Sequence, residues 1–428
     1  MRDTVPKGIL FPLLLIPMFL GGLDTTLFNS VAYDLPVLDD TWRLWFIDGY
    51  SVALAASIVL GSRLGARMGP GLTLAGGLAV FAVAGASPAL LDTGLAWTVT
   101  RFVQGFGYAL MVSSVASIVG SLPRTEERTL AYSLWIGAGS LGAGIGPLFG
   151  RIVVDSGAYT ILFWLPALLA TICGVFAWAL LRGMNPGLAV SRRIDVTSSA
   201  LAFVGFGLLI GGLQSHVGVP LRVIAAVVGC ALLALFCRRQ IRSSDPLIDV
   251  RMLSYSRLGV CALAIVFGYA SYTGSIYLFS ARAETILEIL PISLLTLWVS
   301  LGGLAFSKLH LRFTPIFLLQ ASVAMCALGL IVAAFAGLWL GSFLIGIGVG
   351  VSSAAGDAYL LGSVGAKDVA RAAAVQETSF AVGAALGVAG VGGILATVDS
   401  IPLTAVIAAV AVAAVAASFR LSRGNIRA

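Results

Sequence analysis

The chain has 428 residues, of which 59% are hydrophobic and only 11% are charged. Soluble globular proteins carry about 25% charged residues, so this composition excludes a soluble domain and indicates a chain whose solvent is lipid. The formal net charge of +7 would favour a nucleic-acid partner in a soluble protein, but in a membrane protein the positions of the charges decide their meaning.

Apolar segments of transmembrane length follow one another along the whole chain. A helix needs about 20 residues to cross the hydrocarbon core of a bilayer. The sequence therefore predicts an all-α membrane protein with fourteen transmembrane helices. The expected spans are 8–29, 43–62, 71–91, 95–120, 129–153, 158–181, 196–214, 219–237, 258–280, 285–307, 313–335, 338–363, 370–397 and 402–419.

The basic residues lie mostly in every second connection. With the N-terminus in the cytoplasm, 21 of the 26 lysines and arginines fall on the cytoplasmic side. Cytoplasmic loops of membrane proteins carry such an excess of positive charge. The pattern predicts that both termini are cytoplasmic, and it explains the net positive charge without any nucleic acid.

Two short basic loops indicate an internal repeat. One joins the second and third spans and contains Arg63 and Arg67, and the other joins the tenth and eleventh and contains Lys308 and Arg312. They occupy the same place in two six-helix halves if spans seven and eight are an insertion. Paired halves are a common design in transporters. The predicted division is a six-helix bundle over 1–182, loops with two inserted helices over 183–257, and a second six-helix bundle over 258–428.

A series of short motifs falls on the predicted spans in a recognisable order. They occupy Leu23–Asn29, Leu44–Ser51, Arg101–Gly107, Gly142–Gly150, Asp357–Ser363 and Ala374–Gly387. Together they resemble the fourteen-helix drug:proton antiporters of the major facilitator superfamily, in particular the quaternary-ammonium and multidrug efflux branch. The resemblance implies the major-facilitator fold, with two six-helix bundles and two extra helices, and export coupled to protons.

The chain departs from the family pattern at several motif positions. Ala66 stands where the family's basic loop has an aspartate, and Arg151 replaces a glycine after the fifth-span motif. Gln376 and Ala381 occupy positions where relatives often carry acids. These changes affect residues that the family uses for coupling, so the resemblance alone does not fix the substrate.

Four charged residues within the predicted spans are the candidates for proton coupling: Asp24, Asp48, Arg101 and Glu377. The first three fall at similar depth in the outer half of the membrane, at 1.5 Å of rise per residue. A charged side chain inside a membrane costs at least about 2.5 kcal/mol, so these groups should meet one another or line water. The alternative to a proton-carrying carboxylate is a structural ion pair that locks three helices together.

Two further sets of residues are candidates for gating and for substrate binding. The gating set is Gly142, Gly146, Pro147 and Gly150: the glycines recur on one helix face and permit close approach of a neighbouring helix, and proline permits a bend. Packing alone is the alternative for this stripe. The substrate-binding set is Tyr108, Trp298 and Gln376. The two aromatic rings could hold aromatic or cationic compounds, although such rings also serve as anchors at the membrane surface.

The sequence thus predicts a secondary active transporter in the cell membrane that exports small amphipathic or cationic compounds in exchange for protons by alternating access. Exporters of a single metabolite and a transport-impaired sensor or scaffold remain alternatives. No cofactor, metal site or catalytic cluster is expected, since the only histidines, His216 and His310, are far apart. The expected partners are a small-molecule substrate, protons and the lipid bilayer, and the expected oligomeric state is a monomer.

Overall fold

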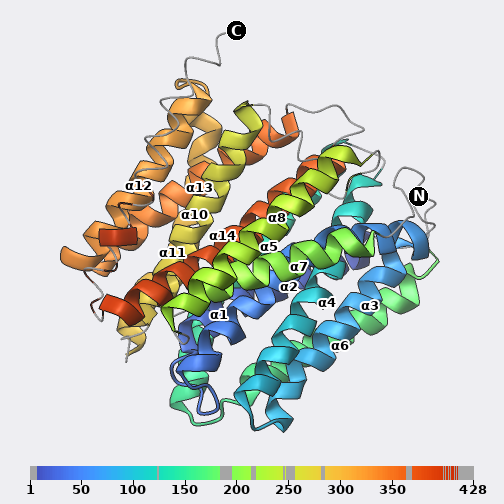
Figure 1. Cartoon of the computed structure of the whole chain (residues 1–428). Coiled ribbons are helices and arrows are strands. Elements are labelled where there is room, and N and C mark those ends of the chain that lie inside the picture. The colour runs from blue at the N-terminus through green and yellow to red at the C-terminus, as the bar shows by residue number, and fades with distance from the viewer. Residues whose placement is uncertain are drawn as a thin grey trace. The chain divides into compact units, whose positions relative to one another are not determined.

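The computed structural model consists of α-helices and one short 3₁₀ helix over the residues that it describes (Figure 1). These residues are 7–122, 125–183, 195–213, 218–243, 256–280, 285–362 and 369–398, with isolated positions at 246 and between 400 and 412. Within them, ten helices are long and apolar enough to cross a membrane, and a bent pair over 42–68 would be an eleventh. The all-α membrane architecture is therefore confirmed. Fourteen crossings are not, and most of the last expected span, 402–419, lies outside the described residues.

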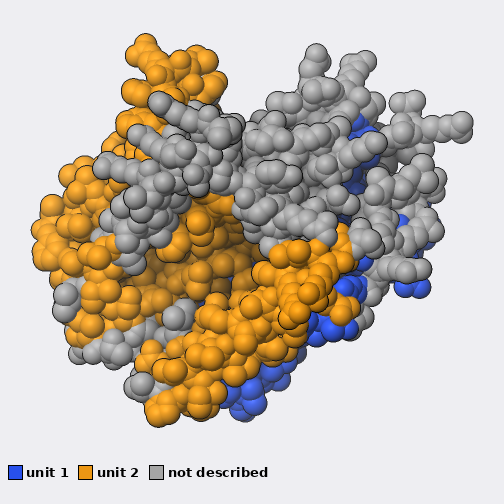
Figure 2. All heavy atoms as spheres, turned by 45° about the horizontal axis from the view of Figure 1, so that its top comes forward, with its two compact units in different colours: residues 1–203 blue, residues 204–428 orange. Residues whose placement is uncertain are grey.

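The chain divides into two compact units, unit 1 over residues 1–203 and unit 2 over residues 204–428 (Figure 2). The predicted three-part division at residues 182 and 257 stays a prediction. The helices that begin in unit 1 are α1 (Lys7–Val31), α2 (Asp40–Met68), α3 (Pro70–Ala86), η1 (Ser87–Leu90), α4 (Gly94–Gly120), α5 (Thr125–Asp155), α6 (Ile161–Leu181) and α7 (Val196–Leu213), the last of which continues into unit 2. Those of unit 2 are α8 (Val219–Arg242), α10 (Ser256–Ser280), α11 (Ile286–Leu309), α12 (Pro315–Phe335), α13 (Leu338–Gly362) and α14 (Val369–Val398).

Local sequence signals set where several of these helices begin. The Thr93 side chain accepts a hydrogen bond from the Ala96 amide at the start of α4, and Thr285 with Glu288 forms a capping box at the start of α11. Both arrangements supply partners for amides that have none inside the helix. Proline starts α3 and α12, where its missing amide costs no hydrogen bond.

Large apolar side chains point outward from many helices. On α3 and α6, Val83 is 72% exposed, Val175 60% and Leu168 55%. A soluble protein rarely exposes such a continuous apolar surface, whereas hydrocarbon is its natural solvent. The composition that excluded a soluble protein is thus explained by the outer faces of the helices as well as by their packed interior.

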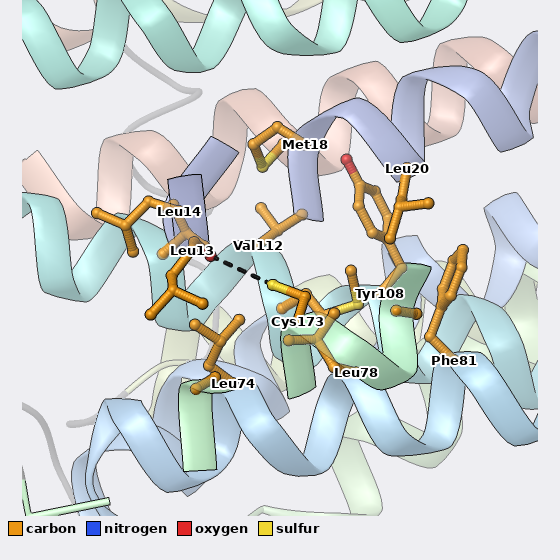
Figure 3. Packing of buried hydrophobic residues seen from close by; sticks show 14 of the residues in the cluster. Leu13, Leu14, Met18, Leu20, Leu74, Leu78, Phe81, Tyr108, Val112 and Cys173 are labelled. Carbon is orange, nitrogen blue, oxygen red and sulfur yellow. Dashed lines mark hydrogen bonds between the residues drawn. The ribbon is translucent and has the colours of Figure 1, made fainter. Parts of the chain in front are cut away.

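The interior of unit 1 is a dense cluster of apolar side chains from α1, α3, α4 and α6 (Figure 3). Leu13 and Leu14 of α1 belong to this cluster together with Leu74 and Leu78 of α3, and the Cys173 thiol of α6 donates to the Leu13 carbonyl at 3.8 Å. This cluster fixes α1 in place, and α1 carries the first acidic residue of the predicted site.

A helix contact of the same kind occurs in both units. In unit 1, the Thr26 hydroxyl of α1 donates to the Ala143 carbonyl of α5 at 2.8 Å. In unit 2, the Thr273 hydroxyl of α10 donates to the Ala384 carbonyl of α14 at 3.0 Å. We call each contact a Thr–Gly seam, because glycines on α5 and α14 flank it. They are Gly142 and Gly146 in unit 1, and Gly383 and Gly387 in unit 2.

Candidate functional site

A buried ion pair joins α1 to α4 inside unit 1. Arg101 Nη1 lies 2.7 Å from Asp24 Oδ2, and the two side chains are only 2% and 1% exposed. Each charge would be costly in a membrane by itself, and pairing offsets part of that cost. The proximity expected from the similar depth of these two residues is therefore present.

Gln104 closes this pair into a three-membered network. Arg101 Nη1 donates to Gln104 Oε1 at 2.8 Å, and Gln104 Nε2 donates to Asp24 Oδ1 at 3.0 Å. Both carboxylate oxygens of Asp24 therefore accept a hydrogen bond. Gln104 was missed as a site residue, although its position three residues after Arg101 places both on one face of α4.

Aromatic rings from α1 and α2 surround the Arg101 guanidinium. Its central carbon lies 4.7 Å from the ring centre of Phe28, 5.1 Å from that of Phe46 and 4.6 Å from that of Tyr50. Arg101 Nε also donates to the Phe46 carbonyl at 3.2 Å. Ring faces attract cations, so the rings hold the positive charge and tie α2 to the pair between α1 and α4.

Asp48 lies on α2, two residues after Phe46 and two residues before Tyr50 in the sequence, and is fully buried. Successive helical residues are about 100° apart, so Asp48 leaves α2 about 200° around from both Phe46 and Tyr50. Since those two rings contact Arg101, the geometry places Asp48 on another face of α2. The direct partner of Arg101 is Asp24, and a coupling role for Asp48 stays a prediction.

Tyr108, a predicted substrate residue, is packed into the core of unit 1 and is only 8% exposed. Its ring stacks with Tyr50 at 5.7 Å between centres and lies 6.4 Å from Phe81 (Figure 3). It also covers Gly21, where an added Cβ would lie 2.0 Å from the tyrosine ring. Through Tyr50, the Tyr108 ring supports the surroundings of Arg101.

The predicted gating glycines of α5 face α1. An added Cβ at Gly142 would lie 2.1 Å from the Phe19 carbonyl oxygen, and one at Gly146 would lie 2.2 Å from Thr26 Oγ1. At Gly150 the nearest atom, on Val31, would be 2.7 Å away. Pro147 lies within the helix beside them. Close helix packing is thus the observed property of these residues, and gating stays a prediction.

The remaining predicted residues belong to unit 2. Trp298 of α11 packs edge-on against Phe343 of α13, with ring centres 5.2 Å apart. Gln376 lies partly buried on α14. The side chain of Glu377 lies outside the part that the structure describes. Among the described residues, no group of histidine, cysteine, aspartate or glutamate could hold a metal ion.

Arg151 holds the connection between α1 and α2. It forms ion pairs with Asp155 on its own helix and, at 3.6 Å, with Asp34 beyond the end of α1. Partial burial raises the pKa of Asp34, and the Asp155 charge adds to this effect, whereas the Arg151 charge opposes it. The arginine that departs from the family motif therefore has a structural partner in this chain.

Arg43 acts on the same connection from the other side. Its guanidinium donates to the Ala32 and Leu38 carbonyls, each at 3.3 Å, and its central carbon lies 4.4 Å from the Tyr33 ring centre. The Ala32 carbonyl follows the last residue of α1, where carbonyls have no partner inside the helix. Arg43 and Arg151, two of the basic residues that the predicted topology does not place on the cytoplasmic side, therefore have local structural partners.

Comparison with known proteins places the chain among membrane transporters. The profile of the Major Facilitator Superfamily matches residues 44–341. The multidrug efflux pump LfrA of Mycolicibacterium smegmatis is 29% identical, over 92% of this chain and 82% of the relative. The methylenomycin A resistance protein of Streptomyces coelicolor is 26% identical, over 92% of this chain and 87% of the relative. The methyl viologen resistance protein SmvA of Salmonella typhimurium is 23% identical, over 81% and 73%.

Solved structures share the fold at low sequence identity. A POT family transporter crystallised with a thioalcohol-conjugated peptide is 15% identical, with a TM-score of 0.75 over 99% of this chain and 98% of that chain. A second POT family structure, with 5-aminolevulinic acid, has a TM-score of 0.73 over 100% and 98%. At this identity the likeness concerns the fold alone.

Proposed function

The chain belongs to the Major Facilitator Superfamily, and on that premise we propose that it exports small amphipathic or cationic compounds from the cell in exchange for protons. Membership of this family makes the chain a multi-pass membrane transporter and not an enzyme. Three of its relatives are named for multidrug efflux or for resistance to methylenomycin A and methyl viologen. Export of such compounds is the activity that these relatives suggest.

The buried network of Asp24, Arg101 and Gln104 is the observation that supports proton coupling. A proton that binds to Asp24 would occupy a carboxylate oxygen that now accepts from Arg101 or Gln104. It would also cancel the negative charge that balances Arg101. The protonated and ionised forms would therefore favour different arrangements of α1 and α4, and a gradient of protons can shift a transporter between two such states.

Asp24 is the proposed proton carrier, and Arg101 and Gln104 hold its ionised form. Asp48 and Glu377 are proposed as secondary carboxylates in the same cycle. Tyr108, Trp298 and Gln376 are proposed to contact the substrate, and Gly142, Gly146, Pro147 and Gly150 are proposed to allow α5 to move against α1 during alternating access.

The proposed architecture has fourteen spans in two six-helix bundles with two inserted helices, in the cell membrane, with cytoplasmic termini. The thirteen α-helices in the described residues follow the first thirteen expected spans in order. Only 11% of the residues in the apolar stretch of α8 are buried, as expected for an inserted helix that contributes little to a bundle interior. The proposed transporting unit is a monomer.

Transport by purified protein in lipid vesicles tests the proposal. We expect an outward-directed flux of protons to drive uptake of ethidium into vesicles that hold wild-type protein, and we expect internal acidification to be lost as dye accumulates. Asp24→Asn should abolish this exchange while the protein still folds. An Asp24→Asn variant that exchanges ethidium for protons as the wild type does would refute Asp24 as the proton carrier. If the wild-type protein moves neither ethidium nor any other compound tested, a sensor or scaffold is favoured instead.

A further inference from the structure

The two Thr–Gly seams allow position-by-position comparison of the units. In unit 1 the seam pairs Thr26 with Ala143, and in unit 2 it pairs Thr273 with Ala384. The glycine contacts follow the same register. An added Cβ at Gly142 would lie 2.1 Å from the Phe19 carbonyl oxygen, and one at Gly383 would lie 2.5 Å from the Val266 carbonyl oxygen. Phe19 and Val266 each come seven residues before the threonine of their seam.

One helical turn before the seam, the units differ sharply. In unit 1 the residues four positions before Thr26 and Ala143 are Gly22 on α1 and Gly139 on α5. A Cβ added to Gly22 would lie 2.0 Å from the Gly139 carbonyl oxygen. In unit 2 the matching residues are Tyr269 on α10 and Phe380 on α14, whose ring centres are 4.8 Å apart. Two backbones in contact in unit 1 thus correspond in unit 2 to two rings in contact, with their planes tilted by 49°.

The rings belong to a small aromatic cluster. Tyr269 also lies 5.4 Å from Tyr272, measured between ring centres. The Tyr272 hydroxyl is hydrogen-bonded to Thr296 of α11 at 2.9 Å and the residue is only 4% exposed. Tyr269 and Phe380 are both partly exposed. One ring is therefore fixed by a hydrogen bond, and the other two present part of their surface outside the packed interior.

This partly exposed surface is not the lipid-facing side of α10. Tyr269 lies at the middle of this 25-residue helix, and tyrosines that face lipid gather near the membrane surface, where the hydroxyl can reach water. Leu263, which is 47% exposed, marks the outward side of α10. Tyr269 lies about 120° around the helix from it, between the side that contacts α14 and the side that contacts α11.

We propose that Tyr269, Tyr272 and Phe380 form a binding site for the aromatic part of an organic cation. This inference rests on the proposed export function and narrows its substrate to flat aromatic cations. Ring faces attract such a cation and stack on its aromatic plane, a combination that needs no charged partner. Gln376 lies one turn before Phe380 on α14, on the same face of the helix, and supplies a polar group beside the rings.

Binding of ethidium to the purified, detergent-solubilised protein tests the site without any proton gradient. Fluorescence titration should give a dissociation constant about tenfold larger for Tyr269→Ala and for Phe380→Ala than for the wild type, since contacts of a cation with desolvated rings contribute about 1–2 kcal/mol. Tyr269→Phe keeps the ring and should bind as the wild type does. Phe317→Ala removes a 43% exposed ring on α12 and is the matched control, with no change expected.

The outcomes separate this inference from the export proposal. Wild-type affinity in folded Tyr269→Ala and Phe380→Ala proteins, judged by size-exclusion profiles, would overturn the aromatic site even if wild-type vesicles exchange dye for protons. An equal loss of affinity in Phe317→Ala would overturn it too. If neutral N-phenyl-1-naphthylamine binds the wild type as tightly as ethidium does, the assignment to cations is wrong. Conversely, a ring-dependent affinity in a protein that moves no dye in vesicles would refute export and leave the site standing.

Discussion

At the scale of single residues, the Asp24 carboxylate is held on both oxygens by donors from one helix. Arg101 and Gln104 lie three residues apart on α4 and reach Oδ2 and Oδ1 respectively. A buried carboxylate held in this way cannot lose one donor without a large change in its surroundings, because unsatisfied buried groups are costly. Stability and proton coupling therefore depend on the same three side chains, and variants must be designed to separate the two.

Removal of Arg101 should damage folding more than removal of the Asp24 charge. Arg101→Ala leaves a carboxylate buried without its cation, and breaking a buried pair from one side typically costs about 3–5 kcal/mol. We expect a clearly lower melting temperature and folded yield for Arg101→Ala. The double variant Asp24→Asn, Arg101→Ala removes both charges and should recover part of the loss. Equal stability of the single and double variants would show that charge is not the cause.

The pKa of Asp34 gives a second residue-scale prediction. This pKa is raised by burial, so the folded protein binds this proton more tightly than the unfolded chain does. The stability linked to it is present at low pH and is lost as pH rises through the raised value. Arg151→Ala removes the opposing charge, so its melting temperature should fall more steeply than that of the wild type as the pH rises above the usual aspartate pKa of about 4. Adding Asp34→Asn should remove this extra slope; if the slope persists, another group causes it.

At the scale of helices, glycine contacts define how closely α1 and α5 approach. The sequence predicted the small face of α5 from the spacing of Gly142, Gly146 and Gly150, but not its partner. The partner depends on hydrogen bonds and contacts between residues more than a hundred positions apart, as Thr26 and Ala143 are. Gln104 and the rings around Arg101 were missed for the same reason, since only the fold shows what these side chains contact.

Alanine substitutions on α5 test the closeness of this packing. At Gly142 an added Cβ would strike the Phe19 carbonyl of α1, whereas at Gly137 on the same helix it would meet nothing within 4 Å. Overpacking costs about 1–3 kcal/mol, so Gly142→Ala should lower the melting temperature and Gly137→Ala should not. The same contrast is expected in unit 2 between Gly383 and Gly390, which likewise has nothing within 4 Å. Equal effects within either pair would refute the packing account.

At the scale of the whole molecule, local properties of the sequence were sufficient to predict the fold family. The composition, the lengths of the apolar segments and the order of the motifs led to the superfamily, and its profile match confirms that assignment. Repeated helix length is a local property, so thirteen expected spans have a helix in the described residues. The orientation in the membrane, unlike the helix lengths, does not follow from the folded chain itself, because the fold is the same whichever side faces the cytoplasm.

Reporter fusions decide the orientation and the number of crossings. If the chain crosses fourteen times with most basic residues inside, fusions at residues 190, 245 and 428 should all report the cytoplasm. Fusions in the α1–α2 and α7–α8 connections should report the outside and serve as controls. An outside signal at residue 428 with cytoplasmic signals at the other two would mean an odd number of crossings after residue 245.

The Thr–Gly seams also bear on how such a protein can evolve. Each seam is made of a threonine hydroxyl, backbone carbonyls and glycines, and the residues one turn away differ between the two units. In one unit that turn carries Gly22 and Gly139, and in the other it carries Tyr269 and Phe380. Each pair fits its own backbone spacing, since a Cβ added to Gly22 would lie 2.0 Å from the Gly139 carbonyl oxygen. An exchange of glycines for rings therefore needs matched substitutions on both helices and a wider spacing of their backbones at that turn, so the two units diverge by paired changes and not by single ones.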